Sequence, residues 1–174
     1  LLDMRTISLN PDQIITLNDY PVHSDDILSE YFNKCKFGEE VAFVPVIEKE
    51  IVRKCLDEEL FKKFVGFESK NPEAKYFMLD GSHRTTALTL CGREIRSVIF
   101  ETNEDIIEAK MAIVTGRILE NGILDCSLEE NCKILNDHFK EKPYFMTVEQ
   151  KTEKMVNEKV IPQDMIDSYH EMGK

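Results

Sequence analysis

The fold of this chain is decided by the stretch Tyr76-Phe77-Met78-Leu79-Asp80-Gly81-Ser82-His83-Arg84. Its apolar first half predicts a buried strand, and Asp80-Gly81 predicts the turn that ends this strand. Residues 85–91 continue as a helix-forming run, and Gly92 is a typical helix stop. A strand, a glycine turn and a helix N-terminus together make an anion site, because backbone N–H groups and the helix dipole point out of the turn. The stretch therefore predicts a phosphate ligand, to which Arg84 adds a bidentate fork.

Length and composition favour a folded protein over a disordered or membrane-spanning one. The chain has 174 residues, 42% of them hydrophobic, which suffices for one domain or for a domain with a helical extension. We find neither an apolar run as long as a membrane span nor a signal peptide, but the first residue is Leu, which leaves open a natural start before Leu1. The five cysteines are odd in number and form no CxxC pair, which favours free thiols in a reduced, cytoplasmic protein.

The formal net charge of −11 argues against a non-specific grip on DNA or RNA, which needs clustered lysines and arginines. DNA is therefore not the expected partner. The segment around the motif, residues 76–100, is the exception to the acidic balance, since it carries three arginines against two acidic residues: Arg84, Arg93 and Arg96 against Asp80 and Glu94. This distribution favours a small anionic ligand over a nucleic-acid track.

Two elements are predicted upstream of the motif. Residues 24–37 have the apolar spacing of a helix, with Ser24 as N-cap and Gly38 as the stop. Residues 41–47 are strand formers, although Pro45 indicates an edge position or the end of a strand. Both elements belong to the same small domain as the motif.

A helical insertion and a helical tail complete the pattern. Helical spacing over residues 49–65 separates two strands that would otherwise be close together, so we interpret about 49–72 as an insertion. Residues 95–100 predict another strand, and residues 101–174 then appear wholly helical. The first signal in this tail is a helix capped by Asn103 that reaches about Ile118, with one stripe of side chains from Ile106 to Arg117. The others are capping boxes at Ser127/Glu130 and Thr147/Gln150, and breaks at Pro143 and Pro162.

These patterns predict an α+β fold. A small mixed sheet is expected in residues 1–100, interrupted by the insertion and followed by the helical extension 101–174. We also expect a homodimer to form, if at all, through this helical region, and no membrane partner.

The motif resembles that of the ParB/sulfiredoxin-like superfamily. The matching residues are Asp80-Gly81-Ser82-His83-Arg84, followed by a helix, by Gly92 and by the strand 95–100. The helix 24–37 and the strand residues 44–47 resemble the elements that precede the motif in that family. In addition, His23-Ser24-Asp25-Asp26 is similar to a His- and acid-bearing segment of the family's free-serine kinase branch.

The resemblance implies a nucleotide-binding enzyme. Sulfiredoxins carry a catalytic cysteine where this chain has Ser82, which argues against their chemistry. Chromosome-partitioning members bind CTP and clamp DNA, which the acidic charge disfavours. The free-serine kinase branch has the turn most similar to this one, and it implies phosphoryl transfer from ATP or ADP, with Mg²⁺, to a small hydroxyl acceptor such as free serine. Nucleotide hydrolysis, a ParB-like nucleotide switch or nuclease acting on DNA, and a non-catalytic interaction module stay open as alternatives.

The resemblance and the residues together define the expected site. The nucleotide phosphates are expected at residues 80–86, that is, at Asp80, Gly81, Ser82, His83, Arg84, Thr85 and Thr86, with Mg²⁺ on Asp80. One of three carboxylates near the start of the first helix is expected to be the general base: Asp25, Asp26 or Glu30. His83 is expected to stabilise the transferred charge.

Structural readings of the same residues remain open. Arg84 could form an ion pair and His83 a hydrogen bond within the turn, while Ser82, Thr85 and Thr86 could be ordinary helix-start residues. Asp25 and Asp26 are also ordinary partners of a helix dipole.

Overall fold

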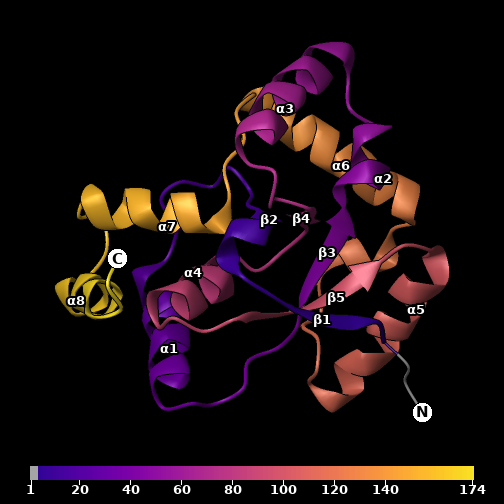
Figure 1. Ribbon diagram of the computed structural model, residues 1–174. Helices are drawn as coiled ribbons and strands as arrows, with labels where there is room; N and C mark the ends of the chain where they lie inside the picture. Colours follow the sequence, from indigo (N-terminus) through magenta and orange to yellow (C-terminus); the bar gives the residue numbers. More distant parts are fainter. Residues whose placement is uncertain (1–3) are drawn as a thin grey trace.

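Five strands form one mixed sheet in the order β1-β5-β3-β4-β2. They are β1 (Thr6–Leu9), β2 (Ile14–Ile15), β3 (Val44–Glu48), β4 (Tyr76–Met78) and β5 (Ile95–Phe100). β3 pairs in parallel with β5 and antiparallel with β4, while β1 is antiparallel to β5 and β2 is parallel to β4. The computed structural model describes residues 4–174 (Figure 1), and it confirms the predicted α+β fold with its small mixed sheet and helical extension.

Pro45 lies in the central strand of this sheet and not at its edge. It is the second residue of β3, and its carbonyl accepts a hydrogen bond from Leu79 N at 2.9 Å. The ladder between β3 and β4 begins one residue later, at the pair of Val46 with Met78. Of the two predicted positions, the strand end is therefore confirmed and the edge is wrong, because a missing N–H costs little where a ladder ends.

The motif folds as strand, turn and helix. β4 ends at Met78, and helix α4 (Ser82–Leu90) begins directly after Gly81. Every residue of α4 is buried, because helices α1 (Asp25–Lys36), α7 (Val148–Asn157) and α8 (Gln163–Glu171) pack around it (Figure 1). The predicted cap of α1 is confirmed, since the Ser24 side chain accepts a hydrogen bond from Ile27 N.

The insertion forms two helices and not one. α2 (Lys49–Arg53) ends in a turn, and α3 (Glu58–Lys70) begins anew with Asp57 as its N-cap. The break is held from outside, because the backbone N–H of Asp57 donates to Asn136 Oδ1 at 2.8 Å on helix α6 (Leu128–Glu141). Such a tertiary contact leaves no mark on the helical periodicity of residues 49–65.

The tail is helical as predicted, but its first helix is shorter than expected. α5 (Asn103–Met111) is capped by Thr102 and not by Asn103, whose Oδ1 instead accepts from Leu128 N at 2.8 Å. Residues 112–115 form a 3₁₀ turn, so the expected stripe towards Ile118 is wrong, and Val114 is 91% exposed. The two predicted capping boxes, at Ser127/Glu130 and Thr147/Gln150, are both formed.

Helices of the tail complete the core on both faces of the sheet. On one face α5 and α6 add Ile106, Leu135 and Phe139 to a cluster that contains Phe77 and Phe100. On the other face α7 and α8 add side chains to a cluster around Val46, Met78 and Ala87, namely Val148, Met155, Met165 and Ile166. Burial of these apolar side chains therefore ties residues 101–174 to the sheet.

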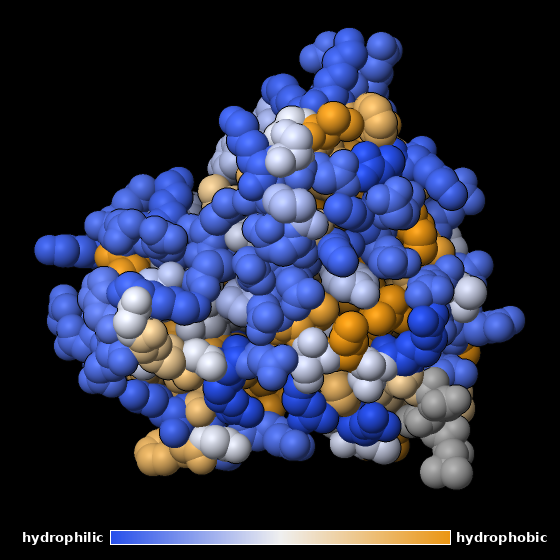
Figure 2. Space-filling view, viewed as in Figure 1, coloured by the Kyte–Doolittle hydropathy of each residue, from blue (hydrophilic) through white to orange (hydrophobic). Residues whose placement is uncertain are grey.

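The outer surface is mostly hydrophilic in the view of Figure 2, as the acidic composition leads us to expect. Among the helices that the structure describes, none combines the length and the apolar character needed to cross a membrane.

Candidate functional site

A cleft of about 230 Å³ opens at the N-terminus of α4. The motif residues 80–84 form its floor, and residues of α1 and of the segment after β2 form its walls, including Asp19, His23, Ile27 and Tyr31. Leu17 and Leu119 add apolar surface. The predicted motif therefore lies in a concave site where polar groups of the motif converge beside apolar surface, as is usual for a small-ligand site.

A larger hollow of about 450 Å³ lies at the other end of α4, next to Gly92. Two of its charged side chains pair with each other, since Lys174 contacts Glu149, which also accepts a hydrogen bond from the Tyr169 hydroxyl at 2.7 Å. It contains no residue of the motif, so we place the candidate site in the smaller cleft.

The turn into α4 presents free backbone donors. Gly81 has a φ of +111°, and a Cβ there would lie 3.2 Å from Arg84 Nη2, so the turn requires glycine. α4 has no side-chain cap and no acidic residue in its first turn. The first N–H groups of the helix therefore have neither of the usual partners, and they suit a negatively charged group.

The guanidinium group of Arg84 binds protein groups and is not free to bind a ligand with both of its terminal nitrogens. Its side chain is only 2% exposed, and Nη1 donates to the carbonyl oxygens of Ala42 at 3.0 Å and Phe43 at 2.7 Å. Nη2 donates to Asp80 Oδ2 at 3.1 Å. Burial lowers the pKa of Arg84, and the negative charge of Asp80 opposes this effect. The bidentate phosphate fork that the sequence predicts therefore has no support in the geometry, although Arg84 lines the cleft.

A carboxylate and a lysine that sequence reasoning missed meet the motif. Ser82 Oγ donates to Asp19 Oδ1 at 2.8 Å, and Lys151 Nζ donates to the same oxygen at 2.8 Å. Lys151 comes from α7 and its side chain is 2% exposed, while Asp19 belongs to the segment after β2. A signal for Lys151 exists in the sequence, since it interrupts the apolar stripe of Val148 and Met155 on α7, where a lysine needs a buried partner. We find no such signal for Asp19.

The charges of the cleft are balanced in pairs. Lys151 faces Asp19, and Arg84 faces Asp80. Burial is the largest influence on Lys151 and lowers the pKa of its ammonium group, while Asp19 raises it. When both pairs are ionised their charges cancel, and the partial positive charge at the N-terminus of α4 has no negative partner. This charge attracts an anion that enters the cleft.

His83 is held as a neutral ring beside the turn. Its Nε2 accepts a hydrogen bond from the backbone N–H of Ser24 at 3.3 Å, and the ring of His23 packs edge-on against it with centroids 4.5 Å apart. Burial lowers the pKa of His83, and the neighbouring His23 lowers it further. Since Nε2 accepts, the proton of the neutral ring is assigned to Nδ1, which is then a donor.

The three carboxylates expected as a base do not line the cleft. Asp25, Asp26 and Glu30 are exposed, and Glu30 lies 3.5 Å from Lys34 in a surface ion pair. The residues of α1 that do line the cleft are Ile27 and Tyr31. They are four residues apart and share a face of α1 next to the face that carries the three carboxylates. The expectation of a base among these three residues therefore has no support in the geometry, and the carboxylates that line the cleft are Asp19 and Asp80.

The two threonines of the motif are buried within α4. Thr85 Oγ1 donates back to the carbonyl oxygen of Gly81 at 2.9 Å, as hydroxyls in helices often do. Neither Thr85 nor Thr86 is among the residues that line the cleft. Their structural reading, as part of the helix start, fits this placement better than direct contact with a phosphate.

The carboxylates available to the expected Mg²⁺ are Asp19 and Asp80, and each already accepts hydrogen bonds through one oxygen. Within residues 4–174 no cluster of three or more His, Cys, Asp or Glu side chains has the arrangement of a metal site. Asp80 engages Arg84 through Oδ2, and Asp19 uses Oδ1 for both of its partners, which leaves one oxygen of each without a hydrogen bond to the protein. Mg²⁺ usually binds proteins through one or two carboxylates together with phosphate oxygens, so this donor set suits an ion that arrives with a nucleotide and not one held by protein alone.

Comparison with protein-family models, with curated proteins and with solved structures yields no match to this chain.

Proposed function

We propose that the cleft binds the phosphates of a nucleotide, ATP or ADP, and that the chain transfers a phosphoryl group to a small hydroxyl acceptor such as free serine, or to water. One observation carries the proposal. At the uncapped N-terminus of α4, a carboxylate that lines the cleft pairs with a buried lysine from a segment far away in the chain. The resemblance of residues 80–84 to the ParB/sulfiredoxin-like superfamily, and in particular to its kinase branch, is part of the same proposal.

The phosphate would be held by donors and not by Arg84. The backbone N–H groups of the first turn of α4 face the cleft, and the buried ammonium group of Lys151 adds positive potential from behind Asp19. His83 Nδ1 is a further donor near the turn. A cleft of about 230 Å³ accommodates phosphate groups and a small acceptor, so the nucleoside would lie outside it, over the rim.

Asp19 is the residue that fits the role of general base. Phosphoryl transfer needs positioning and charge neutralisation above all, together with a carboxylate that accepts the proton of the attacking hydroxyl. Asp19 lines the cleft and is held by two hydrogen bonds to one oxygen, which leaves Oδ2 directed by them. When bound with the nucleotide, Mg²⁺ on Asp80 and Asp19 would supply neutralisation of the phosphate charge.

The cellular setting belongs to the same proposal. Free cysteines fit the reduced cytoplasm, where nucleotides are abundant, and a homodimer through the helical region stays a prediction.

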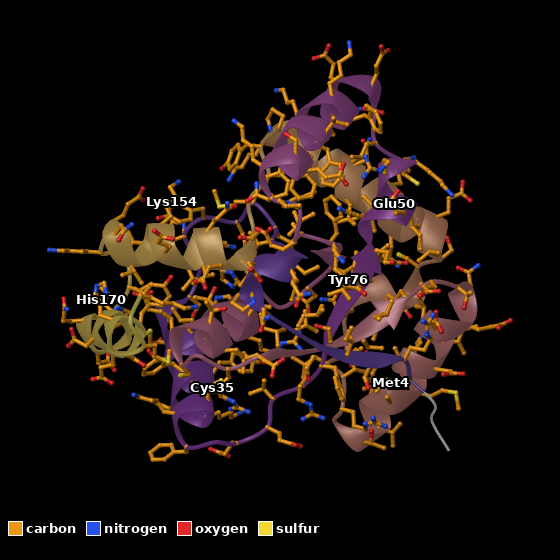
Figure 3. All side chains as sticks on the ribbon, in the orientation of Figure 1. Met4, Cys35, Glu50, Tyr76, Lys154 and His170 are labelled. Carbon is orange, nitrogen blue, oxygen red and sulfur yellow. The ribbon has the colours of Figure 1, made fainter. Side chains whose placement is uncertain are left out.

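Thermal stabilisation by nucleotides tests the proposal. We expect ATP or ADP with Mg²⁺ to raise the unfolding midpoint, since a ligand at 100 times its Kd adds about 2.7 kcal/mol to the stability of the folded state. Lys151→Met should lose most of this shift, because it removes the charge but keeps the volume of the side chain. Lys154→Met is the matched control, since Lys154 lies one turn further along α7 (Figure 3) and stacks on Tyr20 at 4.0 Å.

Each other outcome has a definite meaning. A shift with CTP alone would favour the nucleotide-switch alternative, and a gel-shift assay at low salt would then test for DNA. No shift with ATP, ADP, CTP or GTP, with or without Mg²⁺, would remove nucleotide binding from the cleft. A shift that both lysine variants retain would place the nucleotide elsewhere on the molecule.

A further inference from the structure

Ser82 stands in the arrangement of an activated nucleophile. Its hydroxyl lines the cleft and donates to Asp19 Oδ1 at 2.8 Å, and Asp19 is in turn oriented by Lys151 at 2.8 Å. A hydroxyl, a base within hydrogen-bond reach and a third group that orients the base are the parts that covalent catalysis requires. The sequence predicted for Ser82 a contact with the nucleotide phosphates or a place at the helix start, and no covalent role.

We propose that Ser82 Oγ is itself the first acceptor of the phosphoryl group, so that transfer passes through a phosphoserine at the start of α4. This inference rests on the proposed function for its phosphoryl donor. In the step, a bond forms between Ser82 Oγ and the terminal phosphorus, and the bond from that phosphorus to the bridging oxygen breaks. The bridging oxygen leaves with its electron pair on the shortened nucleotide, and the proton of Ser82 passes to Asp19.

The surroundings stabilise the product of this step. A phosphoserine in the first turn of a helix is favoured by the helix dipole and by the free N–H groups. Once Asp19 carries the proton, its attraction for Lys151 weakens, and the ammonium group becomes available to the new phosphate. Asp19 and Lys151 therefore activate Ser82 before the transfer, and Lys151 and the N–H groups of α4 hold the phosphate after it.

The other hydroxyls of the motif lack this arrangement. Thr85 Oγ1 donates to the carbonyl oxygen of Gly81, which is no base for a proton, and it does not line the cleft. Thr86 does not line the cleft either. Ser82 is thus the hydroxyl of the motif that meets both a base and open space.

The experiment follows the mass of the intact chain after reaction and acid quench. The protein is incubated with Mg²⁺ and ATP or ADP, and separately with Mg²⁺ and acetyl phosphate, a small donor without a nucleoside. We expect one added phosphoryl group, located on Ser82 by fragmentation. Ser82→Ala should abolish it, while Ser69→Ala, at an exposed serine of α3, should retain it. Asp19→Asn should slow the labelling by about 100-fold or more, since it removes the base.

The outcomes separate this inference from the proposed function. Nucleotide stabilisation and turnover without any phosphate on Ser82, or equal turnover in Ser82→Ala, would overturn the inference and leave the function standing. Labelling of Ser82 by acetyl phosphate in a protein that no nucleotide stabilises would support the inference and overturn the nucleotide as donor. Ser82→Ala is expected to fold, because Asp19 keeps its contact with Lys151.

Discussion

Two histidines next to the cleft act as hydrogen-bond acceptors for the backbone. His83 Nε2 accepts from Ser24 N at 3.3 Å, and His138 Nε2 accepts from Asn18 N at 2.8 Å. Burial is the main cause that lowers the pKa of both rings. His138 belongs to α6, and it packs beside the segment that carries Asp19. Protonation of either ring would replace an acceptor by a donor and break its hydrogen bond.

Stability should therefore fall as the pH drops below the ordinary histidine pKa of 6.5. In that window the unfolded chain binds protons at residues 83 and 138, while the folded chain does not until the pH reaches their lowered pKa values. The unfolded state then holds more protons, so the free energy of unfolding decreases with decreasing pH. Urea unfolding between about pH 7.5 and about pH 5.5 measures this slope.

Histidine variants provide the control for this prediction. His138→Gln should flatten the slope because it removes one of the two titrating rings. His170→Gln, at an exposed residue of α8, is the comparison variant. An identical slope in the wild type and in His138→Gln would contradict the assignment.

The start of α4 depends on a single glycine. At Gly81 the φ of +111° lies in the region that L residues rarely adopt, and both Arg84 Nη2 and Val44 Cγ2 crowd the position of a Cβ. This backbone conformation directs the chain from β4 into the cleft and turns the first N–H groups of α4 outward.

Two glycine-to-alanine substitutions should therefore have opposite effects. Gly81→Ala is expected to destabilise the protein by about 1–3 kcal/mol, the usual cost of a non-glycine residue in a left-handed conformation. Gly66→Ala, in the exposed middle of α3 with no atom near the new Cβ, should stabilise it by about 0.5–1 kcal/mol. Free energies of unfolding from urea titration compare them, and equal effects would contradict the strained turn.

The whole molecule is held by a core that residues far apart in the sequence share. Phe139 of the tail is fully buried against Phe77 of the sheet and Phe145, with ring centroids 5.8 and 4.7 Å apart. The ring centroid of Phe64, in the insertion, lies 5.3 Å from the ring centroids of both Phe77 and Phe145. Sheet, insertion and tail therefore meet in one aromatic cluster, and we expect them to unfold together.

Phe139→Ala should destabilise the entire protein by about 3–5 kcal/mol, because it leaves a cavity at the centre of this cluster. Phe37→Ala is the matched control: Phe37 is 82% exposed, so its removal should change the free energy of unfolding by no more than about 0.5 kcal/mol. Circular dichroism and tyrosine fluorescence should report the same midpoint in each variant. Separate transitions would show that residues 101–174 unfold independently of the sheet.

Local chemistry explains what the sequence by itself determined. The strand, turn and helix of residues 76–90, the cap of α1 at Ser24 and the two capping boxes of the tail depend on neighbours within a few residues, so their signals can be read directly. The α+β class follows from the same local patterns. The sequence did not show the break in the insertion, because a contact with α6 stabilises it. It also did not show the end of α5, where the chain continues as a 3₁₀ turn.

Only the tertiary structure decided which side chains form the cleft. Lys151 and Asp19 are 132 positions apart, and Ser82 and Asp19 are 63 apart, so no spacing in the sequence joins them. Arg84 was expected to face a ligand, yet the carbonyl groups of Ala42 and Phe43 bind it first. A buried charge takes whichever partners packing places within hydrogen-bond distance, because leaving it unpaired costs several kcal/mol. The sequence therefore indicated the turn at which the candidate cleft forms, and the packing of distant segments determined which side chains lie beside that turn.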